Sequence, residues 1–332
     1  MTRALVAGLV ALVLAVAAVV VQTATSATTA IGSGVVVIET RLAYQGGEAA
    51  GTGMVLTSSG EILTNNHVIR GATTITVIVP GTSRRYKARV LGYDVPRDVA
   101  LLQVNASNLK TVELGNSSGV KVGQAVKAIG NAGGTGSLTS STGTVTALGR
   151  SITVSDGRGG TARLTGLIET SADLESGDSG GPLFDASGNV VGMNTAATIT
   201  RGPREISDGD GYAIPINRAA SIVDRIESGE GSATVHVGAT AFIGVTVRSS
   251  GYDDSQTGAV VLEVVQGGPA DRAGIAPGSV ITAFAGRPIR SAAALTTAVM
   301  NRKPGEKAAV TYVDPDGTTH RTTITLGDGP PQ

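Results

Sequence analysis

The chain has 332 residues, which is enough for two or three domains and at least one large hydrophobic core. Its 26 Lys and Arg residues balance its 26 Asp and Glu residues, so no overall charge favours nucleic acid or an acidic membrane surface as a partner. The absence of cysteine excludes disulfide bonds, and three scattered histidines form no metal-binding pattern. We therefore expect no metal and no other cofactor.

The N-terminal segment, residues 1–30, differs in composition from the rest of the chain. Arg3 precedes an unbroken apolar run from Ala4 to Val21, which is followed by the small polar stretch QTATSATTA. This order predicts a secretory signal peptide. The apolar run also approaches the roughly 20 residues of a membrane-spanning helix, so an uncleaved membrane anchor stays open. Either way we expect an exported protein, secreted or in the cell envelope, with membrane contact only through this segment.

Residues 31–228 contain many short apolar runs rich in Val, Ile and Thr, separated by Gly, Ser, Pro and Asp turns. The runs fall into two groups, from Val35 to about Gln103 and from about Val120 to Asn217. Evenly spaced short strands are typical of all-β barrels, so the pattern predicts a mostly β domain of two six-strand barrels. Asn217 can cap a helix that Gly229 ends.

The remainder of the chain predicts a connection and a second domain. Residues 229–238, GEGSATVHVG, are interpreted as a linker, and residues 239–328 as a compact β/α unit. This unit has one clear helix, from Ala292 to Met300, which Ser291 caps. Residues 329–332 are expected to form a frayed tail.

Only three histidines can serve as a general base. His67 in LTNNHVI follows an apolar strand, His236 lies in the linker, and His320 lies in a polar turn. A catalytic imidazole needs a carboxylate that fixes its tautomer and stabilises its charged form. Asp98 directly precedes the apolar run VALLQV, whereas Asp94 lies in the turn before it. The sequence therefore favours His67 with Asp98.

The stretch SGDSGGPLF contains the expected nucleophile, Ser179. Its glycines are typical of a turn that either joins two strands or exposes a serine. A serine hydroxyl is a weak nucleophile until a base accepts its proton. With His67 and Asp98, Ser179 completes a triad in one of the few chain orders in which it recurs. A glycine hairpin in a non-catalytic barrel is the alternative interpretation.

Six motifs in order carry a family resemblance: GTGMVL…ILTNNHVI, RDVALLQV, KVGQAVKAIGN, TGTVTALGR, GDSGGPLFDASGNVVGMNT and GYAIPIN. Together they resemble the HtrA/DegP family of trypsin-like serine proteases, and within it the secreted PepA-type proteases of mycobacteria. The resemblance covers nearly everything after residue 30. It implies a chymotrypsin-like pair of perpendicular six-strand β-barrels, with an active site in the cleft between them.

The resemblance also implies a role for each site residue. Ser179 attacks the peptide carbonyl, His67 takes its proton and returns it to the leaving amine, and Asp98 orients the imidazole. The N–H groups of Gly177 and Ser179 form the oxyanion hole. The expected activity is that of a serine endopeptidase, which cleaves unfolded or damaged proteins through an acyl-enzyme and needs no cofactor.

The substrate pocket gives conflicting signals. Asp173, six residues before Ser179, occupies the position that gives trypsin its preference for basic P1 residues. The stretch GYAIP resembles the pocket segment of HtrA proteases, which cut after Val or Ala, and places Tyr212, Ala213 and Ile214 at the pocket. Ile214 is expected to narrow it. We favour a small aliphatic P1 residue, because a carboxylate without room for a long side chain cannot reach its charge.

The C-terminal unit resembles the PDZ domain of the same proteases through AFIGVTV and GGPADRAGIAPGSVI. Phe242, Ile243, Gly244 and Val245 match the loop whose amides hold the C-terminal carboxylate of a peptide, while the following strand pairs with that peptide. The expected partners are peptide C-termini. A β/α module that only covers the protease is the alternative.

Two further alternatives concern the whole molecule. A chaperone or adaptor that binds unfolded polypeptide, with its triad inactive at rest, fits the same sequence. HtrA proteins commonly form trimers through aromatic contacts near the protease N-terminus, but no aromatic residue precedes Val35. A homo-oligomer, a trimer by resemblance, therefore stays open.

Overall fold

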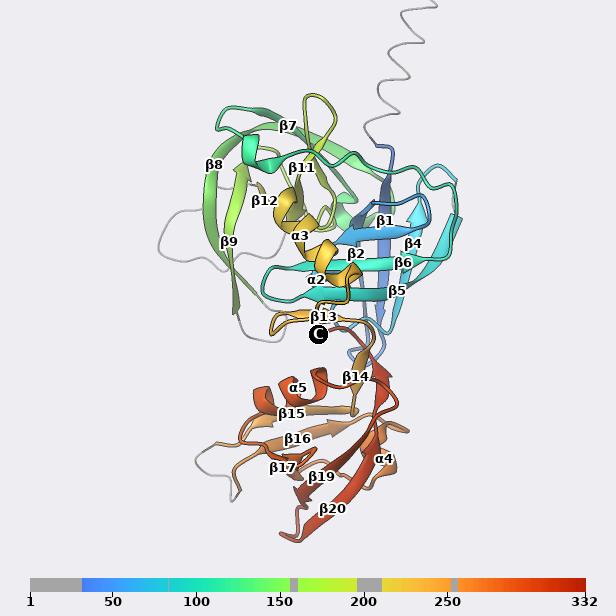
Figure 1. Ribbon diagram of the computed structural model, residues 1–332, viewed down its shortest axis with the longest axis vertical. Coiled ribbons are helices and arrows are strands. Elements are labelled where there is room, and N and C mark those ends of the chain that lie inside the picture. Colours follow the sequence, from blue (N-terminus) through green and yellow to red (C-terminus); the bar gives the residue numbers. More distant parts are fainter. Residues whose placement is uncertain (1–31, 83, 156–160, 196–210, 252–255) are drawn as a thin grey trace, which may run out of the picture.

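The computed structural model describes residues 32–82, 84–155, 161–195, 211–251 and 256–332. The expected signal segment, residues 1–30, lies outside these ranges. No helix within them combines the length and the apolar character needed to cross a membrane. Figure 1 shows two β-rich bodies joined along the long axis, with the strands of residues 35–215 in one and those of residues 240–329 in the other.

The first barrel closes because β5 pairs with β4 on one side and with β6 on the other. Strand β1 runs antiparallel between β2 and β4, so that Val37 lies opposite both Thr52 and Ile78. The inward-facing aliphatic side chains form the barrel core. The six strands are β1 (Val35–Leu42), β2 (Gly47–Val55), β3 (Glu61–Thr64), β4 (Thr74–Val79), β5 (Arg84–Asp94) and β6 (Val99–Val104).

The second group of strands forms a closed barrel in the order β10, β11, β12, β9, β8 and β7. These strands are β7 (Ala125–Gly130), β8 (Thr139–Ser155), β9 (Thr161–Thr170), β10 (Pro182–Asp185), β11 (Val190–Thr195) and β12 (Gly211–Pro215). One hydrophobic cluster includes residues of both barrels, such as Met54 and Met193, and the two barrels therefore share a core. The predicted mostly β, two-barrel fold is confirmed.

Three helical segments matter for the site and the barrel packing. The short helix α2 (Asn66–Ile69) follows β3 directly, and a 3₁₀ turn, η2 (Ala132–Gly134), follows β7. Helix α3 (Ile216–Glu227) places Ile222 and Ile226 in the shared core. Its cap differs from the expectation: Pro215 holds the N-cap position, and the Asn217 side chain instead accepts a hydrogen bond from the Ser117 N–H at 3.0 Å.

The second domain has its own core around the fully buried Phe284. The sheet follows the order β15, β16, β17, β19 and β20, with β18 on β17, while β14 pairs with β21. Its strands are β14 (Thr240–Phe242), β15 (Val245–Ser249), β16 (Ala259–Val264), β17 (Val280–Phe284), β18 (Arg287–Pro288), β19 (Lys307–Val313), β20 (Thr319–Thr325) and β21 (Gly327–Gly329). Its helices are α4 (Pro269–Arg272) and α5 (Ala292–Met300), and the Ser291 side chain caps α5 as expected.

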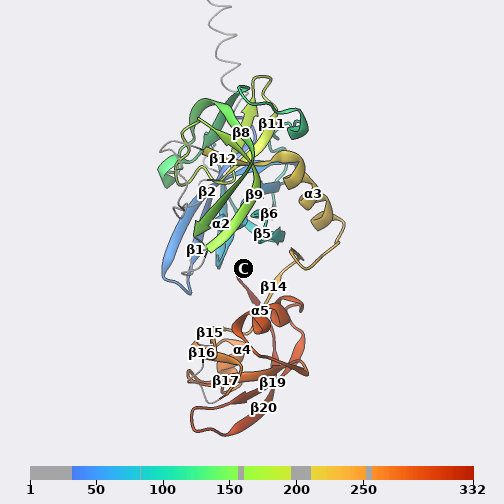
Figure 2. The ribbon, with the colours of Figure 1, turned by 90° about the vertical axis from the view of Figure 1, so that its left-hand side faces the viewer.

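The linker contributes a strand that the sequence did not predict. Strand β13 (Val235–Val237) pairs antiparallel with β5, and His236 lies opposite Tyr93. The Tyr93 hydroxyl in turn lies 3.1 Å from Thr240 Oγ1, at the start of the second domain. The connection between the domains is therefore hydrogen-bonded along the first barrel. Figure 1 places β13 between β5 and the second domain, and Figure 2 shows the chain passing from α3 to β14 between the two domains.

Residues 329–332, expected to be frayed, are ordered against both domains. Gly329 pairs with Thr240, and the Pro331 carbonyl accepts a hydrogen bond from the Gly71 N–H at 2.8 Å. The Gln332 carbonyl accepts one from Asn66 Nδ2 at 3.0 Å. The expectation of a frayed tail is wrong, because these residues accept hydrogen bonds from polar groups of the first domain.

Candidate active site

The structure pairs His67 with Asp98 through two hydrogen bonds. His67 Nδ1 lies 2.7 Å from Asp98 Oδ2, and the His67 backbone N–H donates to Asp98 Oδ1 at 2.8 Å. The Asp98 side chain is 9% exposed and that of His67 is 27% exposed. A carboxylate in this position accepts the Nδ1 proton, which leaves Nε2 free to act as a base.

A tight turn between β5 and β6 presents Asp98 to the imidazole. Asp98 has φ of +57°, a left-handed conformation that aspartate tolerates better than most residues. Its N–H donates to the Val95 carbonyl at 3.2 Å, and its carbonyl accepts a hydrogen bond from Asn65 Nδ2 at 2.9 Å. Both ends of the turn residue are therefore fixed.

The competing carboxylate, Asp94, supports this turn instead of contacting the imidazole. It is fully buried and accepts hydrogen bonds from the Arg97 N–H at 2.9 Å and from Arg97 Nη1 at 2.7 Å. Thr234 of the linker donates a third bond from its hydroxyl at 3.1 Å. Asp94 thus closes the turn that carries Asp98 and ties it to the linker.

Ser179 lies in the loop between β9 and β10, packed against the first barrel. Its carbonyl accepts a hydrogen bond from the Thr52 N–H on β2 at 2.9 Å. The next residue, Gly180, has φ of +86°, and a Cβ there would lie 2.1 Å from the Thr52 carbonyl and 2.3 Å from Thr64 Oγ1. Because β3 ends at Thr64 and α2 then carries His67, this close approach brings the serine loop beside the histidine segment.

The turn before Ser179 has the geometry of an anion site. Gly177 has φ of +102°, and a Cβ would lie 2.1 Å from the Asn131 carbonyl. The Ser176 carbonyl accepts a hydrogen bond from the Gly133 N–H at 2.8 Å. Since a peptide unit is planar, this bond also directs the Gly177 N–H to the opposite side. No partner for that N–H is found within the described ranges, and a buried, unpaired N–H is rare.

Asp178 is buried beside Ser179 and has no cationic partner among the described residues. Its Oδ2 accepts the Glu175 N–H at 2.9 Å, while Oδ1 has no hydrogen-bond partner in the same part of the chain. Burial raises the pKa of Asp178, the hydrogen bond from Glu175 opposes this shift, and the nearby charges of Glu175 and Asp173 add to it.

The expected pocket residues lie in different environments. The Asp173 side chain is exposed, and its N–H donates to Ser141 Oγ at 2.9 Å. Tyr212 and Ile214 are buried in the shared core, and Ala213 faces the core of the second barrel. Their roles in substrate selection stay predictions.

The PDZ-like loop borders a small groove of about 100 Å³ between β15 and α5. Gly244 has φ of +81°, which turns the chain between β14 and β15. The carbonyls of Ile243 and Gly244 accept hydrogen bonds from Ala270 and Val265, so the loop is fixed from behind. The groove is lined by Ala241, Phe242, Ile243, Gly244, Val245, Val247, Leu295, Thr296, Val299, Met300 and Gln332.

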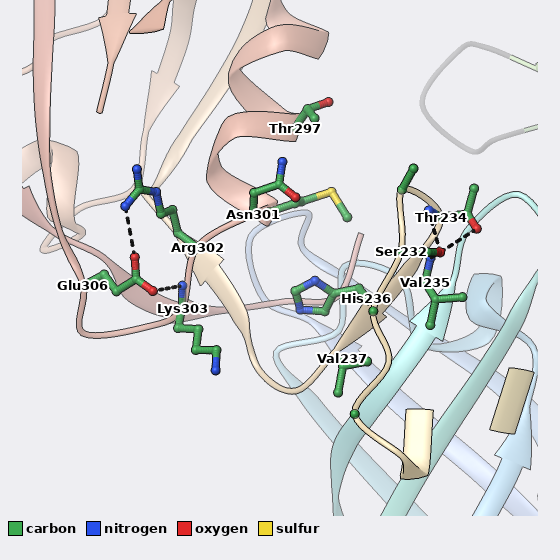
Figure 3. Close-up of a pocket in the computed structure, with 14 residues that line it drawn as sticks. Ser232, Thr234, Val235, His236, Val237, Thr297, Asn301, Arg302, Lys303 and Glu306 are labelled. Carbon is green, nitrogen blue, oxygen red and sulfur yellow. Dashed lines mark hydrogen bonds and ion pairs between the residues drawn. The ribbon is translucent and has the colours of Figure 1, made fainter. Parts of the chain in front are cut away.

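A larger cavity, about 550 Å³, lies between the linker and the second domain (Figure 3). Arg302 Nη1 and Glu306 Oε2 pair across 3.3 Å on its wall. The His236 ring contacts the Tyr93 ring in a tilted arrangement with 4.9 Å between ring centroids, and burial lowers the pKa of His236. None of the triad residues lines this cavity. The described residues also contain no group of three or more His, Cys, Asp or Glu side chains that could hold a metal.

Comparisons with known proteins agree with this geometry. Residues 51–193 match the trypsin-like peptidase domain and residues 241–326 the PDZ domain. Serine protease PepD of Mycobacterium tuberculosis is 36% identical over 308 residues, which are 88% of this chain and 63% of that protein. A probable periplasmic DegP-like serine endoprotease of Ectopseudomonas mendocina is 34% identical over 290 residues, which are 85% of this chain and 57% of that protein.

Solved structures give the same class. The HtrA-type protease AlgW with tripeptide has a TM-score of 0.52 at 28% identity, covering 93% of this chain and 98% of that one. The fold and site thus define a trypsin-like peptidase domain followed by a PDZ domain. The chain is similar to HtrA-type and DegP-like serine proteases over most of its length, and it spans less than two thirds of the length of the curated relatives described above.

Two residues that hold the turn before Ser179, Thr52 and Gly133, were not predicted from the sequence. The motif GTG contains Thr52, but a threonine in a strand is common and carries no signal of its contacts. Gly133 lies in a glycine-rich loop that gives no indication of which carbonyl its N–H will meet. Thr52 and its partner Gly177 are 125 residues apart in the sequence. Whether they meet depends on how the two barrels pack.

We expect Asp178→Asn to stabilise the protein more at pH 7 than at pH 4. The native state retains the Asp178 proton to a higher pH than the unfolded chain, whose carboxyl titrates near 3.8. The contribution of Asp178 to the free energy of unfolding therefore falls as pH rises from about 3.8 through the native pKa. Urea unfolding, followed by circular dichroism in a Ser179→Ala background, measures the difference.

The matched control is Asp173→Asn, which changes an exposed carboxylate of the same loop. Because the Asp173 charge is the smallest contributor to the raised pKa of Asp178, this change is expected to give a much smaller difference between the two pH values than Asp178→Asn gives. An Asp178→Asn effect that is equal at pH 4 and pH 7 would show that the buried carboxyl carries no pH-dependent cost.

Proposed function

We propose that this protein is a serine endopeptidase that hydrolyses peptide bonds in unfolded or damaged proteins. His67, Asp98 and Ser179 form its catalytic triad. The observation that carries the proposal is the pair of hydrogen bonds from His67 to Asp98, at 2.7 and 2.8 Å, beside a serine loop that packs on the same barrel.

In the proposed mechanism, Ser179 Oγ attacks the carbonyl carbon of the peptide while His67 Nε2 accepts its proton. The resulting oxyanion accepts hydrogen bonds from the N–H groups of Gly177 and Ser179. His67 then protonates the leaving amine, and an acyl-enzyme remains. Water attacks this ester with His67 again as the base, which releases the acid and restores the serine.

Typical magnitudes indicate how much each group contributes to the rate. General base catalysis of this kind contributes about 10²- to 10⁴-fold in rate. One oxyanion donor contributes roughly 2.7–4 kcal/mol of barrier lowering. Asp98 holds the imidazole tautomer and stabilises the imidazolium.

The proposed P1 preference depends on the surroundings of Asp173 and on the start of β12. We favour a small aliphatic P1 residue, because the Asp173 side chain is exposed to solvent and is not shielded at the base of a pocket. Gly211 lies against Leu174, whose Cγ would be 2.8 Å from a Cβ at that position. An apolar side chain close to the start of β12 is consistent with an apolar P1 site.

For the PDZ domain we propose binding of peptide C-termini in the groove between β15 and α5. The buried side chains of Leu295 and Val299 form its apolar floor, and the loop from Phe242 to Val245 closes one end. Backbone N–H groups in such a loop hold a carboxylate, and the neighbouring strand offers an edge for pairing.

An active-site phosphonate probe tests the enzyme proposal. The wild-type protein is expected to be labelled and Ser179→Ala to remain unlabelled, because the probe reacts only with an activated serine. Ser187→Ala, which removes an exposed hydroxyl from the β10–β11 turn, serves as the matched control and should be labelled normally. The labelled protein is expected in the extracytoplasmic fraction, in keeping with relatives named as periplasmic endoproteases.

The same experiment separates the enzyme from a chaperone or adaptor. Absence of labelling in the wild-type protein, with unfolded casein or PDZ peptide present as well as without them, would favour a binding protein with an idle triad. Equal labelling of the wild type and Ser179→Ala would place the nucleophile elsewhere.

Two peptide substrates that differ only at P1, Val against Arg, test the proposed specificity. We expect kcat/KM to be at least about 10-fold higher for Val, because an apolar site gives an arginine head group no counter-charge. Initial-rate kinetics measure the ratio. Faster cleavage after Arg would assign Asp173 the role of a P1 counter-ion instead.

Adjacent threonines of α5 provide a test of the PDZ groove. Thr296 lines the groove, whereas Thr297 lines the separate linker cavity. Thr296→Glu is expected to raise the Kd of a fluorescent peptide with an apolar C-terminus at least about 10-fold, because peptide binding would bury the new charge. Thr297→Glu should leave the Kd nearly unchanged, as measured by fluorescence anisotropy. Equal effects of the two changes would exclude this groove.

A further inference from the structure

We propose that Thr52 is a positioning residue for the oxyanion turn, acting through its hydroxyl group. The inference rests on the proposed peptidase function and adds a residue of the first barrel to an oxyanion turn that is otherwise built from the second barrel. Thr52 lies in β2 and does not touch the reacting atoms; it would act on the two N–H donors through the neighbouring peptide units, whose Gly177 and Ser179 carbonyls it binds.

Every polar atom of Thr52 is engaged, and the residue is completely buried. Its hydroxyl donates to the Gly177 carbonyl at 2.7 Å and accepts from the Asn131 N–H at 2.9 Å. Its own N–H donates to the Ser179 carbonyl at 2.9 Å. Its carbonyl accepts from Thr64 Oγ1 at 2.7 Å. One residue thus connects the serine loop, the loop after β7 and the end of β3.

These bonds fix the peptide planes that surround the oxyanion donors. The Gly133 bond to the Ser176 carbonyl orients the peptide that contains the Gly177 N–H. The Thr52 hydroxyl orients the following peptide through the Gly177 carbonyl. Because Gly177 has no Cβ and a φ of +102°, its own sterics restrain the turn weakly. The external bonds therefore determine where its N–H points.

Valine at position 52 would keep the shape of the side chain but remove its hydroxyl group. The Gly177 carbonyl and the Asn131 N–H would both lose a partner in a buried site, which is unfavourable for each group. Rotation of the Gly177 peptide would let its carbonyl find another partner, at the expense of the oxyanion geometry. A valine at this position should therefore impair the transition state more than the binding of substrate.

The bond to Thr64 extends the same restraint towards the base. Thr64 is also fully buried, ends β3 and lies three positions before His67. The distance between the serine turn and the histidine segment is thus set by a short hydrogen-bonded path through Thr52. A packed, buried path of this kind transmits a displacement of one end to the other.

Thr52→Val and Thr52→Ser test the role of the hydroxyl. Loss of one oxyanion donor lowers kcat by about 10²- to 10³-fold, and misalignment should cost part of this, so we expect Thr52→Val to lower kcat about 10- to 100-fold. Its KM should change less than about twofold, since the lost interaction is made only in the transition state. Thr52→Ser retains the hydroxyl and should keep kcat within about threefold of wild type.

A second readout separates positioning from general structural damage. A peptidyl aldehyde forms a tetrahedral adduct with Ser179, and the oxyanion of this adduct occupies the oxyanion hole. In a Ser179→Ala variant the same aldehyde binds only noncovalently and forms no oxyanion. Thr52→Val should weaken the inhibition by the aldehyde about 10-fold or more and leave the noncovalent Kd within about twofold. Both variants are first checked for folding by circular dichroism.

Each contrary outcome has a distinct meaning. Equal kcat for Thr52→Val and Thr52→Ser would overturn the inference, as would a change in KM and stability with kcat intact. If Thr52→Val does not fold, Thr52→Cys replaces it, because a thiol is a weaker donor and acceptor of similar size. Equal kcat for Cys and Ser would again overturn it. Failure of the wild type to react with the phosphonate would instead overturn the proposed function.

Discussion

A carboxylate that accepts two hydrogen bonds from one histidine is the constraint around which the protease domain is arranged. Asp98 fixes both the ring and the backbone of His67, at 2.7 and 2.8 Å. This requires a turn with a left-handed residue, a buried Asp94 that closes the turn, and a short helix that begins directly after β3. The barrel strands on either side hold these segments at the necessary separation.

The second domain is attached to the same two segments. Thr234 of the linker bonds to Asp94 beneath the turn that carries Asp98, and Gln332 bonds to Asn66 in the helix that carries His67. Tyr44 stacks on Phe242 with ring centroids 5.4 Å apart, between the β1–β2 hairpin and the PDZ loop. Both ends of the second domain therefore lie against the segments that carry His67 and Asp98.

Much of this arrangement follows from local sequence. Short runs rich in Val, Ile and Thr, separated by turn residues, predicted the two barrels, and the motifs around His67, Asp98 and Ser179 indicated the candidate triad. These features are readable because each depends on residues close together in the chain, such as Asp98 directly before the apolar strand β6. Ser291 as the cap of α5 is of the same kind.

The features that could not be predicted depend on distant partners. Strand β13 has only three residues, which is too few for a recognisable sequence pattern. It forms because the last residues of β5, beyond the part that pairs with β4, offer an open edge about 140 positions earlier in the chain. The expected Asn217 cap was wrong because the Asn217 side chain accepts a hydrogen bond from the Ser117 N–H instead. Thr52 looks like any strand threonine until the second barrel places Gly177 and Asn131 beside it.

The pairing of β13 with β5 has a kinetic consequence. A flexible tether would let the two domains reorient on the timescale of loop diffusion, whereas here the linker is an edge strand of a barrel. Reorientation requires that this strand detach, which is a local unfolding event with its own free energy. The rate of any large swing of the PDZ domain is therefore governed by strand release, and amide exchange at Gly238, whose N–H donates to the Leu91 carbonyl of β5 at 2.8 Å, would report it directly.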